Sequence, residues 1–187
     1  MPDPMETLAI ENVVASAALD QELALATLAD DLDGVTYTPE QFSGIIYRLQ
    51  DPKATVLIFR SGKLVCTGAQ SQAEMQTAIE RAVNAIESLG VDVPDELSIT
   101  VQNIVVSGDL GCTLNLNAIA IGLGLEAVEY EPEQFPGLVY RVDDPEVVVL
   151  LFGSGKLVIT GGTDVEEANQ AIEYVSVRLA ELGLLGV

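Results

Sequence analysis

The chain contains one segment twice, and this duplication limits the possible folds more than any other feature. Residues 37–67 read YTPEQFSGIIYRLQDPKATVLIFRSGKLVCT, and residues 130–160 read YEPEQFPGLVYRVDDPEVVVLLFGSGKLVIT, with 19 of 31 positions identical at an offset of 93. The similarity extends to residues 11–16 and 102–107, at an offset of 91. Such a repeat predicts two equivalent halves. We place the first repeat in residues 1–93 and the second in residues 94–187.

Each half shows the same succession of apolar patterns. In the first half these patterns predict a strand, a helix, three strands and a long helix, at residues 8–16, 19–32, 45–49, 54–58, 64–69 and 71–89. Ser71 with Glu74 is typical of a helix start, and Gly90 ends this helix. The second half ends with a helix over residues 164–182. The short joint at residues 91–95 favours one continuous antiparallel sheet, and hence an α+β fold.

Both faces of the predicted sheet are apolar. In the run at residues 147–152, Val148, Leu150 and Phe152 share one face because strand side chains alternate, and the other three apolar residues share the opposite face. Helices can cover only one face of an antiparallel sheet. Either something else covers the second face, ordinarily a second layer of protein such as a dimer partner, or that face stays exposed to water.

Four phenylalanines occur in the chain, and all lie at matched positions of the duplicated blocks. Phe42 and Phe135 adjoin glycine-containing loops, whereas Phe59 and Phe152 lie at strand ends before a Ser-Gly turn. Phenylalanines in such places tend to be exposed, which is unfavourable unless a partner uses them. The alternative is that they are ordinary core aromatics preserved by duplication.

The charge of the chain argues at first against binding to nucleic acid. The formal net charge is −21, from 29 acidic and 8 basic residues, and acidic groups repel phosphates. The acidic residues crowd the predicted helices and joints. Six of the eight basic residues instead fall in the duplicated blocks, namely Arg48, Lys53, Arg60, Lys63, Arg141 and Lys156. This distribution predicts one acidic surface and one nearly neutral surface with a few cations.

Several kinds of chemistry find no support in the sequence. The chain has no histidine, which removes the commonest general base and metal ligand. Cys66 and Cys112 fit no metal-site spacing and are expected to be reduced thiols in an intracellular protein. Residues 153–156 resemble a phosphate-binding loop, but the long glycine spacing and the following Ser or Thr are missing, so a hairpin turn explains them better. No apolar run is long enough for a membrane span. We therefore expect neither enzyme activity nor a cofactor or metal.

The repeated blocks YxPEQF(S/P)G, IFRSGKLVCTGA and LFGSGKLVITGG resemble the TATA-box-binding protein family, in its archaeal type. The resemblance runs from about Glu6 to Leu182. It implies a saddle: a curved, ten-stranded antiparallel sheet with two helices per repeat on the convex face. It also implies a general transcription initiation factor that binds and bends A/T-rich promoter DNA through the minor groove. The implied partners are double-stranded promoter DNA, transcription factor B and RNA polymerase, and the implied location is the cytoplasm, at the nucleoid. A homodimer of the DNA-free protein is a further possibility.

The resemblance also implies a role for individual side chains. Phe42, Phe59, Phe135 and Phe152 would intercalate between base pairs. The base contacts would come from Asn12, Val14, Leu57, Val65, Thr67, Asn103, Val105, Leu150, Val158 and Thr160. The phosphate contacts would come from Arg48, Lys53, Ser61, Lys63, Arg141, Ser154 and Lys156. Glu131, Glu133 and Gln134 would contact transcription factor B.

Three positions depart from the family pattern. Gln70, Glu146 and Thr163 stand where family members often carry a basic residue, which should weaken phosphate contact. With the net charge of −21, these departures suggest adaptation to a salt-rich cytoplasm. We therefore expect DNA binding that needs high salt, because salt screens the repulsion between acids and phosphates. A sheet domain that binds protein or lipid is the competing interpretation, and it would not need Asn12, Asn103 or the four phenylalanines.

Overall fold

The computed structural model describes residues 3–185, which form two compact units with the same internal order. The first-repeat unit comprises residues 12–102, and the second-repeat unit comprises residues 3–11 together with 103–185. Hydrogen bonds join ten strands in the order β2-β3-β4-β5-β1-β6-β10-β9-β8-β7. This duplicated antiparallel sheet with two α-helices per repeat confirms the expected fold class. Each unit is described by itself below.

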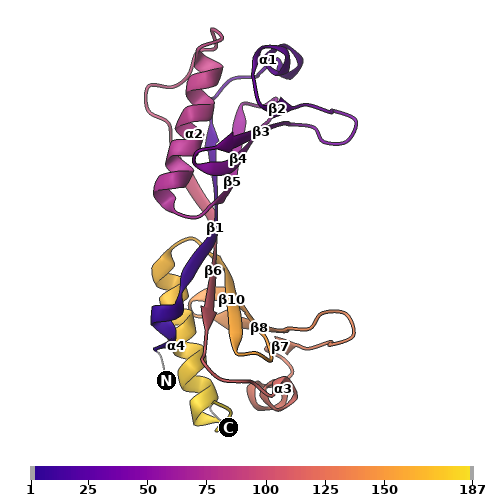
Figure 1. The fold of residues 1–187 in the computed structure, drawn as a ribbon, viewed down its shortest axis with the longest axis vertical. Coiled ribbons are helices and arrows are strands. Elements are labelled where there is room, and N and C mark those ends of the chain that lie inside the picture. The colour runs from indigo at the N-terminus through magenta and orange to yellow at the C-terminus, as the bar shows by residue number, and fades with distance from the viewer. Residues whose placement is uncertain (1–2, 186–187) are drawn as a thin grey trace. The chain divides into compact units, whose positions relative to one another are not determined.

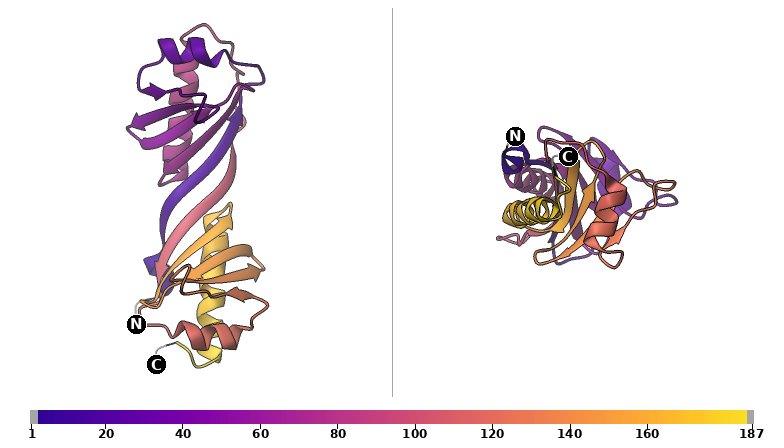
Figure 2. Two further views of the ribbon diagram at one scale, coloured as in Figure 1. Left: turned by 90° about the vertical axis from the view of Figure 1, so that its right-hand side faces the viewer. Right: turned by 90° about the horizontal axis from the view of Figure 1, so that it is seen from below.

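The elements of the first-repeat unit follow the predicted succession closely. They are β1 (Ala9–Ala18), α1 (Leu25–Asp31), β2 (Val35–Thr36), β3 (Ile45–Gln50), β4 (Lys53–Ile58), β5 (Lys63–Ala69) and α2 (Gln72–Glu87). The long helix α2 lies along one face of these strands (Figures 1 and 2). It buries Met75, Ile79 and Ile86 against strand residues such as Ile58 and Leu64. Truncating one such core side chain to alanine typically costs about 2–5 kcal/mol.

The second-repeat unit repeats this arrangement with elements of similar length. It contains η1 (Pro4–Thr7), β6 (Thr100–Asp109), α3 (Leu116–Leu123), β7 (Val128–Glu129), β8 (Leu138–Asp143), β9 (Glu146–Leu151), β10 (Lys156–Gly162) and α4 (Val165–Glu181). The helix α4 covers one face of its strands and buries Ile172, Val175 and Leu179 there. Asp164 caps its first turn by accepting a hydrogen bond from the Glu166 backbone N–H at 3.0 Å.

The prediction of a helix from residue 19 is wrong in its first part, because the α-helix begins only at Leu25. Residues 19–23 instead run along the turn between β4 and β5, where the Leu19 and Leu23 N–H groups donate to the carbonyls of Gly62 and Arg60. The close approach requires a glycine at position 62, since a side chain there would collide with the Gln21 carbonyl. Gly62 also has a φ of 87°, a conformation that glycine adopts without strain.

Helix α2 begins as predicted, with one difference in its cap. Ser71 Oγ accepts a hydrogen bond from the Glu74 backbone N–H at 3.0 Å, as a capping residue does. The Glu74 carboxylate accepts from the Gln70 N–H at 3.0 Å rather than from Ser71, so the reciprocal bond lies one residue earlier. Gly90 follows the helix with a φ of 91°, in agreement with a glycine stop.

Candidate nucleic-acid interface

In each unit the strand face opposite the long helix carries a row of half-buried apolar and small polar side chains, which we call the open face. On β4, for example, Val56 and Ile58 are fully buried beneath α2, whereas Thr55 and Leu57 alternate with them and are only partly covered. The same alternation places twelve matched residues on the open faces: Asn12, Val14, Ser16, Leu57, Val65, Thr67, Asn103, Val105, Ser107, Leu150, Val158 and Thr160. Among the described residues, no further layer of the same unit covers these side chains.

The strand register brings the predicted base-contact residues of each unit side by side. In the first-repeat unit, Leu57 pairs with Val65, and Val65 pairs with Ser16 on its other side. In the second-repeat unit, Val158 lies between Leu150 and Ser107 in the same way. The two units therefore present the same apolar strip. The prediction did not include Ser16 and Ser107, although their place two residues after Val14 and Val105 would have revealed them.

Each open face contains one asparagine whose amide is held in a fixed orientation. Asn12 Oδ1 accepts a hydrogen bond from the Gly68 N–H at 2.6 Å, and its Nδ2 donates to Thr67 Oγ1 at 3.3 Å. In the second repeat, Asn103 Oδ1 accepts from the Gly161 N–H at 2.7 Å, and Nδ2 donates to Thr160 Oγ1 at 3.0 Å. A backbone N–H fixes which amide atom is oxygen. Each Nδ2 retains a second hydrogen for an external acceptor.

The four phenylalanines form two matched pairs, neither of them in the core. The rings of Phe42 and Phe59 meet edge to face with centroids 5.8 Å apart, and those of Phe135 and Phe152 do so at 5.9 Å. Phe135 is 38% exposed, and the other three are partly exposed. Such a pair contributes about 0.5–1.5 kcal/mol beyond area burial. The interpretation as core aromatics therefore does not hold.

A buried glycine lies beneath each aromatic pair. A Cβ atom on Gly137 would lie 2.7 Å from Phe135 Cε1 and 2.9 Å from Phe152 Cε1, closer than real Cβ contacts. A Cβ atom on Gly44 would meet the Ile58 carbonyl at 2.9 Å and both rings of its pair at about the same range. Both rings of each pair thus rest on a glycine that allows them to approach the backbone.

The predicted phosphate contacts lie at the turns and edges around the open faces. Ser61 Oγ and Ser154 Oγ each accept a hydrogen bond at 3.4 Å from the backbone N–H two residues later, in the turns that carry Lys63 and Lys156. Arg48 donates to Thr36 Oγ1 at 3.3 Å, whereas Arg141 forms an ion pair with Glu129 at 3.4 Å. The predicted set is thus placed near the open faces in both repeats.

The loop before Phe135 contains the residues expected to contact transcription factor B. The Glu131 carbonyl accepts hydrogen bonds from the N–H groups of Gln134 and Phe135, at 2.9 and 3.0 Å, and so closes the loop. The side chains of Glu131, Glu133 and Gln134 are exposed. A shallow hollow of about 270 Å³ next to them is lined by Glu129, Glu131, Gln134, Phe135, Gly137 and Val139.

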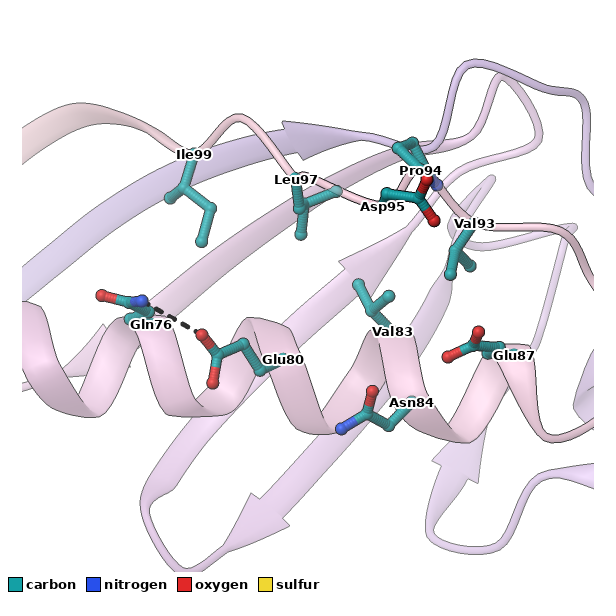
Figure 3. Close-up of a pocket in the computed structure, with 10 residues that line it drawn as sticks. All are labelled: Gln76, Glu80, Val83, Asn84, Glu87, Val93, Pro94, Asp95, Leu97 and Ile99. Atoms are coloured by element: carbon teal, nitrogen blue, oxygen red, sulfur yellow. Dashed lines mark hydrogen bonds between the residues drawn. The ribbon is translucent and has the colours of Figure 1, made fainter.

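A separate groove on the helix side of the first-repeat unit offers no catalytic arrangement. It lies between α2 and residues 93–99, with apolar Val83 and Leu97 facing it and the carboxylates of Glu80 and Glu87 along its edge (Figure 3). Its one hydrogen bond between lining side chains runs from Gln76 Nε2 to Glu80 Oε1 at 3.0 Å. In residues 3–185 no group of side chains is arranged to hold a metal ion. Within the same residues, no helix is both long enough and apolar enough to span a membrane.

The fold and the site together define a protein with a duplicated sheet, whose open faces rather than a pocket carry the candidate binding residues. The sequence matches the family described as transcription factor TFIID, or TATA-binding protein, at residues 7–89 and again at residues 98–182. The chain belongs to this family of DNA-binding transcription factors, which is not a family of enzymes.

Relatives of known name support this assignment over nearly the whole chain. The chain is 60% identical to TATA-box-binding protein E of Halobacterium salinarum over 99% of its own length and 100% of that protein. It is 59% identical to the TATA-box-binding protein of Natronomonas pharaonis, with 99% of each chain covered. The solved structure of Methanococcus jannaschii TBP covers 94% of this chain and 99% of its own, with a TM-score of 0.84 and 47% identity. The chain is thus of the archaeal, halophilic type.

Proposed function

We propose that this protein is a general transcription initiation factor that binds A/T-rich promoter DNA through the minor groove and bends it. The observation that carries the proposal is the matched pair of open faces, each with an oriented asparagine and a rim of two phenylalanines. No described part of either unit covers these faces, and all relatives reported above are named as TATA-box-binding proteins or TBP.

Selection of A/T pairs follows from the chemistry of the open faces. In the minor groove an A·T pair offers only acceptors, whereas a G·C pair adds the guanine amino group as a donor. The free hydrogen on Asn12 Nδ2 or Asn103 Nδ2 can bond to an adenine or thymine acceptor. The surrounding valines and leucines have no acceptor for a guanine amino group, which would lose its hydrogen bond to water. G·C pairs are therefore disfavoured.

Bending follows from the two aromatic pairs. Phe42 with Phe59, and Phe135 with Phe152, would enter base steps at the two ends of the contacted DNA. Unstacking a base step costs a few kcal/mol, a figure established on minor-groove binders that include this same family. Contact between the apolar strips and the unwound groove offsets that cost by removing apolar area from water. Free of DNA, the same apolar faces are expected to favour a homodimer.

The decisive test compares a TATA-containing duplex with its GC-substituted counterpart at molar salt, by fluorescence anisotropy, with bending read from energy transfer between end labels. The wild type should bind and bend only the first duplex. Phe152→Ala should abolish bending while the circular dichroism spectrum stays native. Tyr174→Ala serves as the control, because this side chain is 45% exposed on α4, away from the open face. Equal affinity for both duplexes would refute the proposal.

The protein further recruits transcription factor B, and through it RNA polymerase, by way of the loop at Glu131 and Glu133. Both carboxylates are exposed, and Glu131 lines the hollow next to Phe135. The first repeat has Thr38 in place of the first glutamate and keeps the second as Glu40. This one difference restricts the recruiting loop to the second repeat. We place the resulting complex on the DNA of the cytoplasmic nucleoid.

Charge reversal separates the two loops experimentally. Glu133→Lys should leave TATA binding near the wild-type level but prevent the mobility shift caused by purified transcription factor B. The matched variant Glu40→Lys in the first repeat should still give that shift, since Glu40 occupies the equivalent position at an offset of 93. If both variants or neither variant lost the shift, the loop at Glu131 would not be the recruiting site.

A further inference from the structure

Two matched hollows lie at the edge of the sheet in each unit, at the ends of the β3–β4 and β8–β9 hairpins, and their charges are opposite. The hollow of the first-repeat unit, about 520 Å³, includes Arg48, Gln50, Lys53, Gln70 and Glu74 in its lining. The hollow of the second-repeat unit, about 570 Å³, is lined at the equivalent places by Arg141, Asp143, Glu146 and Glu167. Two cations and one carboxylate in the first repeat thus correspond to one cation and three carboxylates in the second.

In the first repeat the cations of this edge face neutral groups. Arg48 Nη1 contacts the hydroxyl of Thr36 at 3.3 Å, and Lys53 lies opposite Gln50 across the β3–β4 hairpin. The one carboxylate of the hollow, Glu74, accepts the Gln70 N–H at the start of α2. Both cations are exposed and have no carboxylate partner among the described residues, so they are available to an anion.

In the second repeat each corresponding cation is replaced or faces a carboxylate. Arg141 is held by Glu129, which stands where the first repeat has Thr36. Glu146 occupies the place of Lys53 and lies directly opposite Asp143 across the β8–β9 hairpin. Two carboxylates opposite each other repel both one another and any phosphate that approaches.

The turn lysines show the same difference between the repeats. Lys63 pairs across the strands with Ala18, whereas its equivalent Lys156 pairs with Asp109. Asp109 Oδ1 accepts the Gly111 N–H at 2.8 Å, which orders this carboxylate on the strand residue opposite Lys156, although the two form no ion pair within 4 Å. Hence Arg48, Lys53 and Lys63 face neutral partners, whereas their two cationic equivalents in the second repeat, Arg141 and Lys156, each face a carboxylate. The fourth cation of the first duplicated block, Arg60, pairs with Glu22 at 3.8 Å and is replaced by Gly153 in the second.

We propose that the protein binds the DNA backbone unequally, with the first repeat dominant through two separate phosphate contacts, one at Arg48 and Lys53 and the other at Lys63. This inference rests on the proposed function, since it concerns the same DNA contact. In molar salt the Debye length is about 3 Å, so only groups in direct contact with a phosphate affect its binding. The groups next to each cation therefore determine how strongly it binds a phosphate, and the net charge of the chain does not.

If the first repeat binds phosphates more tightly than the second, the charges at the sheet edges determine which end of a DNA site each repeat occupies. On a base sequence that is palindromic, the six matched pairs of open-face residues named above give no preference, because each pair is identical in the two repeats. If the phosphates at one end of such a site are replaced by neutral methylphosphonates, the first repeat should occupy the end that is still charged.

The experiment reads orientation with a cleavage reagent attached near the first-repeat loop. The protein carries Thr38→Cys for attachment of an iron chelate and Cys112→Ser to remove the half-buried thiol. Cys66 is fully buried, and burial raises the pKa of its thiol to about 11, so it stays unlabelled. The DNA is a palindromic A/T site with two methylphosphonates at one end. Cleavage should favour the charged end by about fivefold or more.

The exchange of Lys53→Glu with Glu146→Lys tests the assignment to named residues. It keeps the formal net charge at −21, places opposite charges across the β8–β9 hairpin and should weaken the cleavage preference, because the first repeat loses one of its three cations and gains a carboxylate. Glu173→Lys, an exposed site on α4, controls for the charge change of Glu146→Lys alone and should not alter the preference.

The outcomes separate this inference from the proposed function. Binding to the A/T site with equal cleavage at both ends, or a preference that the exchange leaves unchanged, would overturn the unequal binding of the backbone and leave minor-groove binding intact. Failure to bind the unmodified A/T site at all would overturn both.

Discussion

The glycine beneath the second aromatic pair allows a test of the wedges without removing either ring. A Cβ atom at position 137 would lie 2.7 Å from Phe135 Cε1 and 2.9 Å from Phe152 Cε1. Carbon atoms at optimal contact are about 3.5–4.0 Å apart, so Gly137→Ala should displace the rings by about 1 Å. The backbone at this position is not in the left-handed region, and therefore an alanine causes no backbone strain of its own.

The cost to folding should be small, because the clashing atoms are the far ends of side chains that are partly exposed. Loss of the edge-to-face contact would cost about 0.5–1.5 kcal/mol. For a chain of this size, that corresponds to a decrease in Tm of roughly 1–6 °C. The cost to DNA binding should be larger, because displaced rings no longer fit the base step at this end. If about 1.4–2.8 kcal/mol is lost, the affinity falls tenfold to a hundredfold.

Gly153→Ala is the matched control, since a Cβ atom there has only the Leu114 carbonyl within reach, at 3.8 Å. Affinity and bending are measured by anisotropy and energy transfer on a TATA duplex, and Tm by circular dichroism. If Phe152→Ala bends no DNA but Gly137→Ala bends it normally, the position of the rings does not matter and the argument is refuted. A large decrease in Tm would instead show that Gly137 is needed for folding.

Three further outcomes follow from the structure. Asn103→Asp keeps the acceptor for the Gly161 N–H but removes the amide donor. The ratio of the affinity for TATA DNA to that for GC-substituted DNA should therefore fall by about tenfold or more. Asn117→Asp, on the exposed side of α3, is the control and should not change this ratio. The affinity for TATA DNA should rise between low and molar salt because salt screens the 29 acidic residues, and a gel-shift titration in which affinity falls steadily would contradict this. Burial raises the pKa of the Cys66 thiol to about 11, so its contribution to stability is complete below the unfolded value of about 8.5 and is lost as the pH rises to about 11. Denaturant titrations should therefore show a shallower alkaline decline for Cys66→Ala than for the wild type.

The strands and their two faces could be predicted from the sequence because alternation is a local property. The pattern in residues 147–152 indicated which side chains share a face, and the structure confirms it with Val147, Val149 and Leu151 buried and Leu150 half-buried. The helix over residues 19–32 was predicted wrongly for a related reason. Leu19, Leu23 and Leu25 are all buried, as a helix face would be, but the first two lie in a non-helical segment that is hydrogen-bonded to the turn at residues 60–62.

The geometry of the site depended on contacts that no local pattern reveals. The orientation of Asn12 comes from Gly68, 56 residues away, whose φ of 87° accompanies a shift of register between β1 and β5. Likewise, Lys156 lies opposite Asp109 only because strands β10 and β6 pair in this register. The resemblance to a family supplied the expected roles of these residues, and the sequence alone offered no means to learn which cations face carboxylates.

A duplicated sheet raises the question of how a promoter, which has a direction, is read by two equal halves. The six matched open-face positions named above cannot supply direction, because Asn12, Val14, Ser16, Leu57, Val65 and Thr67 have identical residues at their second-repeat equivalents. The differences in charge lie outside these faces, where Glu129, Glu131 and Glu146 replace Thr36, Thr38 and Lys53. Under the proposed function, these replacements would affect phosphate contact and recruitment of transcription factor B. Base composition would then be read by the shared faces, and direction by the edges and the loop in which the repeats diverge.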